Sequence, residues 1–162
     1  MPGQTYETTP DRTVVGWREW VRLPGVGVPW IKAKIDTGAR TSSLHAFDLR
    51  PYEAEGGHRV RFSIHPWQAT PADETAVDLP VHDERTVRSS SGHVETRYVV
   101  LVPLVLADRQ VPAEVTLTDR DEMGFRMLVG REALVQGFVV DPSVSYAGGR
   151  PDRATRKKNW GR

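Results

Sequence analysis

The triplet Asp36-Thr37-Gly38 is the part of this sequence best suited to chemistry. It ends the stretch from Trp30 to Ile35, in which apolar and polar residues alternate as they do along a β-strand. A threonine hydroxyl can brace a turn, and a glycine lets the backbone pass close to a carboxylate because it has no Cβ. The pattern therefore predicts one carboxylate held on a tight turn.

A carboxylate held in this way can hydrolyse peptide or amide bonds when a second carboxylate lies beside it. Two like charges about 3 Å apart cannot both ionise, so one group stays protonated. The ionised group accepts a proton from water, and the protonated group donates a hydrogen bond to the scissile carbonyl.

No second Asp-Thr-Gly or Asp-Ser-Gly occurs in the 162 residues. The simplest source of the second carboxylate is Asp36 of an identical chain across a two-fold axis, so we expect a homodimer. The alternative interpretation is a turn with a purely structural role.

Short segments with strand-like patterns follow one another along the chain and predict an all-β domain, either a closed barrel or a sandwich. The expected strands cover residues 14–21, 30–35, 41–45, 59–65, 77–81, 98–106, 111–117, 127–129 and 138–140. Residues 131–136 are expected to form the only helix, ended by Gly137.

Residues 86–97 have strand-like flanks around the small residues Ser89-Ser90-Ser91-Gly92, which predicts a hairpin. Its tip could move as a lid does over a cleft. An ordinary hairpin tip is an equally good interpretation.

Asp36-Thr37-Gly38-Ala39, followed by Thr41-Ser42-Ser43, resembles the active-site turn of the retropepsin-like aspartic peptidases. Leu128-Val129-Gly130-Arg131 is similar to their apolar-apolar-Gly-Arg motif, which leads into a single helix. The resemblance implies an all-β closed barrel of acid-protease type with one short helix. It also implies a homodimeric aspartic endopeptidase that acts on a peptide or protein substrate.

The same resemblance assigns roles to individual residues. It implies catalytic roles for Asp36, Thr37 and Gly38, and a structural role for the motif Leu128, Val129, Gly130 and Arg131. Residues 88–95 correspond to the flap that closes over substrate, so Ala39 and the flap residues Ser90, Ser91 and Gly92 are expected to contact substrate.

The stretch from Val15 to about Tyr146 looks still more like a bacterial family labelled ATP-dependent zinc protease, whose members include domains linked to glutamate ligases of the ATP-grasp type. The residues disagree with that label. A Gly-rich loop with Lys-Ser or Lys-Thr is absent, and so is His-Glu-x-x-His. We therefore expect no cofactor and no metal, although a zinc site built from His45, His82 and His93 is an open alternative. An ATP-grasp ligase is a candidate partner.

Two positions depart from the retropepsin pattern. Arg40 stands where those enzymes usually carry an acid that helps to bind the substrate backbone. In the relatives, the arginine matching Arg131 pairs with an acid of the active-site region. That acid is missing here, so Asp48, Glu95 or Asp119 is the expected substitute.

Composition narrows the remaining possibilities. Cysteine is absent, no run of about 18 apolar residues occurs, and residues 1–12 lack the apolar segment of a secretory signal. We therefore expect a cytoplasmic protein without a membrane span. Three parts are expected: a flexible N-terminus over 1–12, the retropepsin-like domain over 13–147, and a basic flexible tail over 148–162. The tail has six basic residues and one acid, and a solvated end is favoured over a nucleic-acid contact.

Two alternatives to the aspartic endopeptidase remain at this point. The same barrel could dimerise and hold a peptide or a ligase partner without cutting it. A zinc-dependent peptidase, as the family label says, is the other. The sequence specifies neither the substrate nor the working pH.

Overall fold

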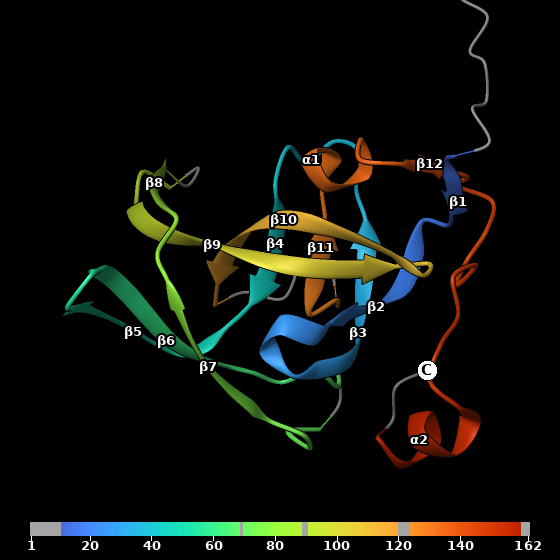
Figure 1. Cartoon of the computed structure of the whole chain (residues 1–162), viewed down its shortest axis with the longest axis horizontal. Coiled ribbons are helices and arrows are strands. Elements are labelled where there is room, and N and C mark those ends of the chain that lie inside the picture. The colour runs from blue at the N-terminus through green and yellow to red at the C-terminus, as the bar shows by residue number, and fades with distance from the viewer. Residues whose placement is uncertain (1–10, 69, 89–90, 120–123, 160–162) are drawn as a thin grey trace, which may run out of the picture.

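The computed structural model describes residues 11–68, 70–88, 91–119 and 124–159. Most of these residues lie in strands (Figure 1). The strands are β1 (Thr13–Val15), β2 (Arg18–Leu23), β3 (Val28–Ile35), β4 (Ser42–His45), β5 (Phe47–Ala54), β6 (Gly57–Ile64), β7 (Thr75–Pro80), β8 (Asp83–Arg88), β9 (Val94–Leu106), β10 (Arg109–Thr118), β11 (Met127–Val129) and β12 (Phe138–Val140). The helices are the 3-10 turn η1 (Pro24–Val26), α1 (Arg131–Leu134) and α2 (Arg153–Lys158).

Six of the strands form a closed barrel. The order is β10-β4-β11-β3-β2-β9, and β9 pairs again with β10 to close the ring. Two neighbouring pairs, β3 with β11 and β4 with β10, are parallel, and β8 extends the sheet beyond the ring by pairing with β9. The prediction of an all-β closed barrel is confirmed.

The alternation of apolar and polar residues along each strand determines which side chains face the inside of the barrel. Ile31, Ala33 and Ile35 of β3 are buried, while Lys32 and Lys34 between them are only partly covered. Burying one side chain of the size of leucine or isoleucine contributes about 1.5–3 kcal/mol. The strands therefore close around an apolar core, which keeps the end of β3 in a fixed position.

Two smaller sheets flank the barrel. Strands β5, β6 and β7 form an antiparallel sheet that packs Val60, Phe62 and Ile64 against the core. Strands β1 and β12 form a parallel pair from the two ends of the domain, with Val14 facing Val139.

One predicted strand is split in two. Residues 14–21 were expected to be continuous, but the structure divides them into β1 and β2 at Gly16. A Cβ on Gly16 would lie 2.2 Å from the carbonyl oxygen of Val144, so the returning chain occupies the space of a side chain there. The break allows β1 to leave the barrel and pair with β12.

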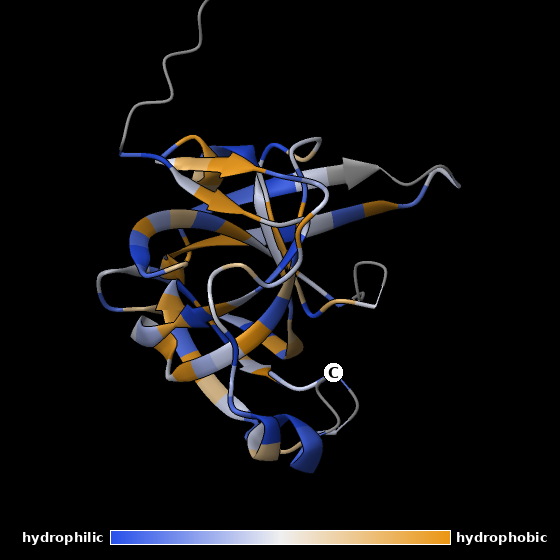
Figure 2. Ribbon diagram, turned by 90° about the vertical axis from the view of Figure 1, so that its right-hand side faces the viewer, coloured by the Kyte–Doolittle hydropathy of each residue, from blue (hydrophilic) through white to orange (hydrophobic). Residues whose placement is uncertain are grey.

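The prediction of a single helix was incomplete. Besides α1, which begins at the expected Arg131, the structure has α2 inside the basic tail (Figure 1). The Asp152 carboxylate caps α2 by accepting a hydrogen bond from the Thr155 N–H at 2.7 Å. Figure 2 shows α2 as strongly hydrophilic, at the end of the barrel opposite α1. In the described part of the chain, no helix has the length and apolar character needed to cross a membrane.

Candidate active site

Asp36 follows the last residue of β3 and lies on a loop that the backbone holds tightly. Its N–H donates to the Val129 carbonyl at 2.9 Å, and its Oδ1 accepts the Gly38 N–H at 2.9 Å. The Ala39 N–H then returns to the Asp36 carbonyl at 3.3 Å. These bonds fix both the backbone and the carboxylate, so Asp36 is presented in one orientation.

The second half of the site comes from β11. Because β3 and β11 are parallel, with Ile35 level with Val129, both strands end at the same edge of the barrel. Gly130 follows Val129, and its N–H donates to the Ser42 hydroxyl at 3.1 Å. The two motifs, 94 residues apart, therefore meet in one loop cluster.

A glycine is required at position 130 because there is no space for a Cβ, and not because of its backbone conformation. A Cβ there would lie 2.5 Å from the carbonyl oxygen of Thr41 and 2.9 Å from that of Ala39. Contacts under 3.0 Å to backbone atoms cannot be relieved by turning a side chain. The glycine lets the Asp36 loop pass directly over the end of β11.

Arg131 holds the loop from the other side. Its Nη1 donates to the carbonyl oxygens of Thr37 and Gly38, each at 3.1 Å, and its own N–H donates to the Ala39 carbonyl at 2.7 Å. The expectation of an acidic partner for Arg131 was wrong, since its guanidinium binds backbone carbonyls of the active-site loop. Its role is to fix the shape of that loop.

An open pocket of about 320 Å³ lies beside the Asp36 carboxylate. Its lining consists of Asp36, Ala39, Thr41, Ser42, Ser43, Arg85, Arg97, Thr116 and Leu128. Among these described residues Asp36 is the only acid, while the two arginines come from β8 and β9, the strands that flank the predicted flap. The pocket therefore pairs one candidate catalytic carboxylate with two positive charges.

The two arginines face each other across the flap arm, which is the antiparallel pair β8–β9. The arm and α1 lie at the same end of the barrel in Figures 1 and 2. Arg85 of β8 is the register partner of Arg97 of β9, so both side chains extend from the same face of the arm. Ser91 and Gly92 are exposed, and Gly92 has a φ of 84°. Ser90 lies outside the described residues.

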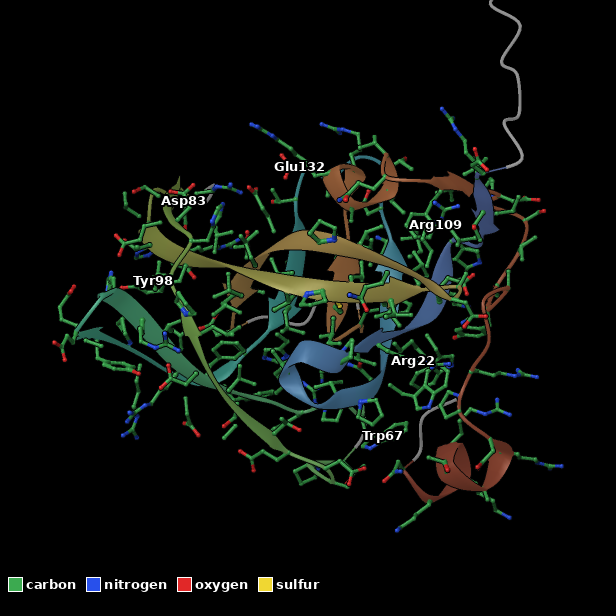
Figure 3. The ribbon with its side chains drawn as sticks, viewed as in Figure 1. Arg22, Trp67, Asp83, Tyr98, Arg109 and Glu132 are labelled. Carbon is green, nitrogen blue, oxygen red and sulfur yellow. The ribbon has the colours of Figure 1, made fainter. Side chains whose placement is uncertain are left out.

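Charged side chains form pairs both beside the arm and beside the loop cluster. Glu114 of β10 accepts from Arg85 Nη2 at 3.1 Å and lies 3.2 Å from His82 Nε2. The hydrogen bond from Arg85 lowers the pKa of Glu114 below its usual value. On the other side, Glu132 pairs with Arg40 at 3.1 Å. Figure 3 labels Asp83 of the arm and Glu132 of α1.

The structure brings together most of the predicted site residues. Asp36, Ala39 and Leu128 line the pocket, and Gly130 and Arg131 support the loop from below. Thr37 and Gly38 are exposed and lie on the Arg131 side. Arg85 and Arg97 were missed, because Arg85 lies one residue before the hairpin predicted over 86–97 and the pairing of the two arginines depends on the register that the structure shows.

The histidines named as alternative zinc ligands lie in separate surroundings. His45 Nδ1 is 2.9 Å from Arg126 Nη1 and its ring lies 4.3 Å from Phe47, whereas His82 pairs with Glu114. Within the described residues, no group of three His, Asp or Glu side chains is placed to hold a metal ion.

Residues 14–151 match the model of the RimB-like family, described as the retropepsin-like aspartic endopeptidase RimB. The chain belongs to this family. The closed barrel and the loop geometry around Asp36 agree with that membership.

Curated relatives carry a different name. The chain is 47% identical to a probable alpha-L-glutamate ligase of Parasynechococcus marenigrum, over 83% of this chain and 29% of the relative. It is 40% identical to a probable alpha-L-glutamate ligase of Shewanella halifaxensis, over 93% of this chain and 33% of the relative. The chain thus spans about a third of the length of these relatives.

Among solved structures, a Legionella pneumophila protein of unknown function, Lpg0085, superposes with a TM-score of 0.69 at 25% identity. The match covers 85% of this chain and 98% of that one. These comparisons establish the retropepsin-like family, and the label of an ATP-dependent zinc protease is not among their descriptions.

Proposed function

We propose that this RimB-like chain is an aspartic endopeptidase whose active site forms between two copies. The supporting observation is the Asp36 loop, which holds one carboxylate by backbone bonds at the edge of an open pocket in which no other described residue is acidic. An acid pair needs two such groups. Asp36 of a second chain supplies the other.

In the proposed reaction, one Asp36 carboxylate removes a proton from water as the water oxygen attacks the scissile carbonyl carbon. The protonated Asp36 of the other chain donates a hydrogen bond to the carbonyl oxygen, where negative charge develops. The C–N bond then breaks, and the amine leaves with a proton from the pair. Thr37, Gly38 and Arg131 keep each carboxylate in place.

The face for this association lies beside the Asp36 loop. Three valines are exposed there: Val14 of β1 to 54%, Val139 of β12 to 37%, and Val135, directly after α1, to 77%. A second pocket, of about 370 Å³, borders this group and is lined by Thr37 and Arg131 among others. A two-fold contact here would bury the valines and bring the two Asp36 loops together.

The substrate we propose is an acidic peptide, with glutamate side chains at the positions next to the cut bond. Arg85 and Arg97 present two guanidinium groups to the pocket that contains Asp36, and guanidinium groups bind carboxylates in a two-pronged manner. Relatives named probable alpha-L-glutamate ligases agree with chemistry that involves glutamate. The exposed Ser91 and Gly92 would cover the bound chain.

The test is Asp36→Asn, assayed on an oligomer of α-linked L-glutamate by mass spectrometry. We expect the variant to fold and to dimerise, and to lose at least about a hundredfold in cleavage rate, because general acid–base groups contribute on that scale. Asp108→Asn is the control, since Asp108 lies in the exposed β9–β10 turn with a φ of 63°, a conformation that asparagine also tolerates. Unchanged cleavage by Asp36→Asn would remove the mechanism.

A second candidate function is a barrel that binds a ligase or an acidic peptide without cutting it. The observation in its favour is that the ligase relatives are about three times as long as this chain, so a domain of this kind occurs together with ligase sequence. Binding of the glutamate oligomer without any product from the wild-type dimer would favour this function. Loss of cleavage on treatment with a chelator would instead favour a zinc-dependent peptidase.

A further inference from the structure

A cluster of aromatic and positively charged side chains lies outside the candidate active site, around Tyr146. The Tyr146 and Trp20 rings have centroids 6.4 Å apart. The Arg18 guanidinium carbon lies 4.8 Å from the Tyr146 ring centre and 4.6 Å from that of Trp17. Lys32 Nζ is 5.5 Å from the Trp20 ring centre and 5.8 Å from that of Tyr146. Two cations are thus held against three aromatic rings.

Further positive charge reaches the same place from α2 and the segment before it. Burial raises the pKa of the Tyr146 phenol, while the charges of Arg18, Arg150 and Arg156 act on it in the opposite direction. Burial and the Arg18 charge lower the pKa of Lys32. Arg18 and Lys32 thus lie against the Tyr146 ring, and the charges of Arg150 and Arg156 act on its phenol as well.

The two acids facing this cluster are already used by the backbone. Glu19 is fully buried and accepts hydrogen bonds from the N–H groups of Gly16, Ala147 and Gly148 at 2.7–2.9 Å. Asp152 caps α2 through Thr155. Among the described residues named here, the two carboxylates oppose four cations, Arg18, Lys32, Arg150 and Arg156, so positive charge is in excess.

Several buried polar atoms in the cluster have no hydrogen-bond partner among the described residues. They are Trp20 Nε1, Tyr146 Oη and Arg156 Nε, and Trp20 is only 2% exposed. The neighbouring Trp67, labelled in Figure 3 and 5.8 Å from Trp20, differs, because its Nε1 donates to Asp73 at 2.7 Å. A buried donor without a partner costs about 1–3 kcal/mol, so an acceptor from outside would be favoured.

The backbone at Tyr146 is also unusual. Its φ of 54° lies in the left-handed region, which costs energy for a residue with a side chain. Its N–H donates to the Arg18 carbonyl at 3.0 Å, which locks the segment onto β2. The structure thus holds the phenol in this place against a local conformational preference.

We propose that the Tyr146 cluster, formed by Trp20, Tyr146, Arg18, Lys32 and Arg156, binds an oxyanion, a carboxylate or a phosphate. Each unpartnered atom can donate a hydrogen bond, and the cations supply the opposite charge. Helix α2, which carries Arg156, lies at the opposite end of the barrel from α1 in Figures 1 and 2, whereas Arg18 is the register partner of Lys34 near the end of β3. None of the five cluster residues lines the pocket beside Asp36, so the proposal does not depend on the proposed peptidase function.

The test is a titration followed through the indole N–H signals in ¹H–¹⁵N NMR spectra of the full chain. Inorganic phosphate and succinate are added separately, with sodium chloride at equal ionic strength as the reference. We expect the Trp20 signal to shift in a saturable way with at least one anion, while that of Trp67 stays in place. The anion that saturates the shift of the Trp20 signal at the lower concentration identifies whether the site prefers a phosphate or a carboxylate. A Trp20 signal that responds no more than it does to chloride would overturn the proposal.

Matched variants separate a specific site from general attraction to a basic surface. Arg156→Gln should weaken binding by about tenfold, as expected for the loss of one hydrogen bond to a charged group. Arg153→Gln removes the same charge from an exposed position of the same helix and should leave the affinity within about twofold. Equal loss in both variants would contradict the site. Tyr146→Phe keeps the ring and serves as a second test if Arg156→Gln does not fold.

Discussion

The Asp36 loop and the β8–β9 arm face the same pocket, but different kinds of bond hold them. Every bond named for the loop has a backbone group on at least one side: the Asp36 N–H donates to the Val129 carbonyl, the Gly38 N–H to the Asp36 carboxylate, and the Arg131 guanidinium to two carbonyl oxygens. Strand β8 pairs only with β9, and charged side chains tie it to its other neighbours through Arg85–Glu114 and Glu84–His58. The difference indicates a rigid part for chemistry and an adjustable part for choosing the substrate.

Gly130→Ala should have the largest effect, because it breaks the rigid half. The added methyl group would lie 2.5 Å from the Thr41 carbonyl oxygen, so the loop and β11 would have to separate. We expect the free energy of unfolding to fall by about 3 kcal/mol, as for a tightly overpacked site. Urea denaturation measures it.

Gly56→Ala is the comparison for that variant. Gly56 has a φ of 100° but no atom within 4 Å of the added methyl group, so it tests backbone strain without crowding. We expect the free energy of unfolding of Gly56→Ala to fall by less, by about 1 kcal/mol. An equal or greater loss of stability in Gly56→Ala would contradict the claim that the close backbone contact at Gly130 holds the site together.

Arg85→Gln and Arg97→Gln should act on the adjustable half. Each variant removes one guanidinium group from the pocket, so kcat/KM for a glutamate oligomer should fall by at least about tenfold. Stability should change little, and cleavage of an uncharged peptide should be unaffected. A uniform loss on both substrates would contradict a role in choosing acidic side chains.

Glu114→Gln should give a smaller effect of the same kind. The variant keeps the shape of the side chain but weakens its hold on Arg85, and partly exposed ion pairs contribute up to about 1 kcal/mol, so KM should rise by about twofold to fivefold. Because Arg85 lowers the pKa of Glu114, the link is complete above the usual carboxyl pKa and is lost as the pH falls through the lowered value. Kinetics at several pH values would show wild type and variant converging in acid.

The smallest effect is expected for Asp78→Asn. Asp78 lies in β7, outside both the Asp36 loop and the β8–β9 arm. Asp78 accepts from Tyr52 at 2.5 Å and pairs with Arg61 and Arg59, which lowers its pKa to about 2. Its contribution to stability is therefore present above the usual pKa of 3.8 and disappears as the pH falls toward 2. The stability difference between wild type and Asp78→Asn should vanish in that window, whereas a constant difference would contradict the pKa shift.

The rigid half could be predicted from the sequence because its signals are local. Alternation before Asp36 predicted β3, and Leu128-Val129-Gly130-Arg131 predicted a strand that leads into a helix, which the structure shows as β11 and α1. The closed barrel was predicted in the same way, from strand patterns and turn residues.

The remaining features depend on contacts between distant residues. The break at Gly16 depends on Val144, and the burial of Glu19 depends on N–H groups 128 and 129 residues away. The partner of Arg131 turned out to be backbone, which no search for acids could find. Only α2 had a local signal that was overlooked, since Asp152 three residues before Thr155 is a recognisable helix cap.

The most direct test of the central claim is an experimental structure of the protein in its associated state, with the distance between the two Asp36 carboxylates as the measurement. The account predicts a two-fold dimer in which these carboxylates lie within about 3 Å of each other, close enough to share one proton. A monomer, or a dimer that keeps the two groups too far apart for one water to bridge them, would contradict it.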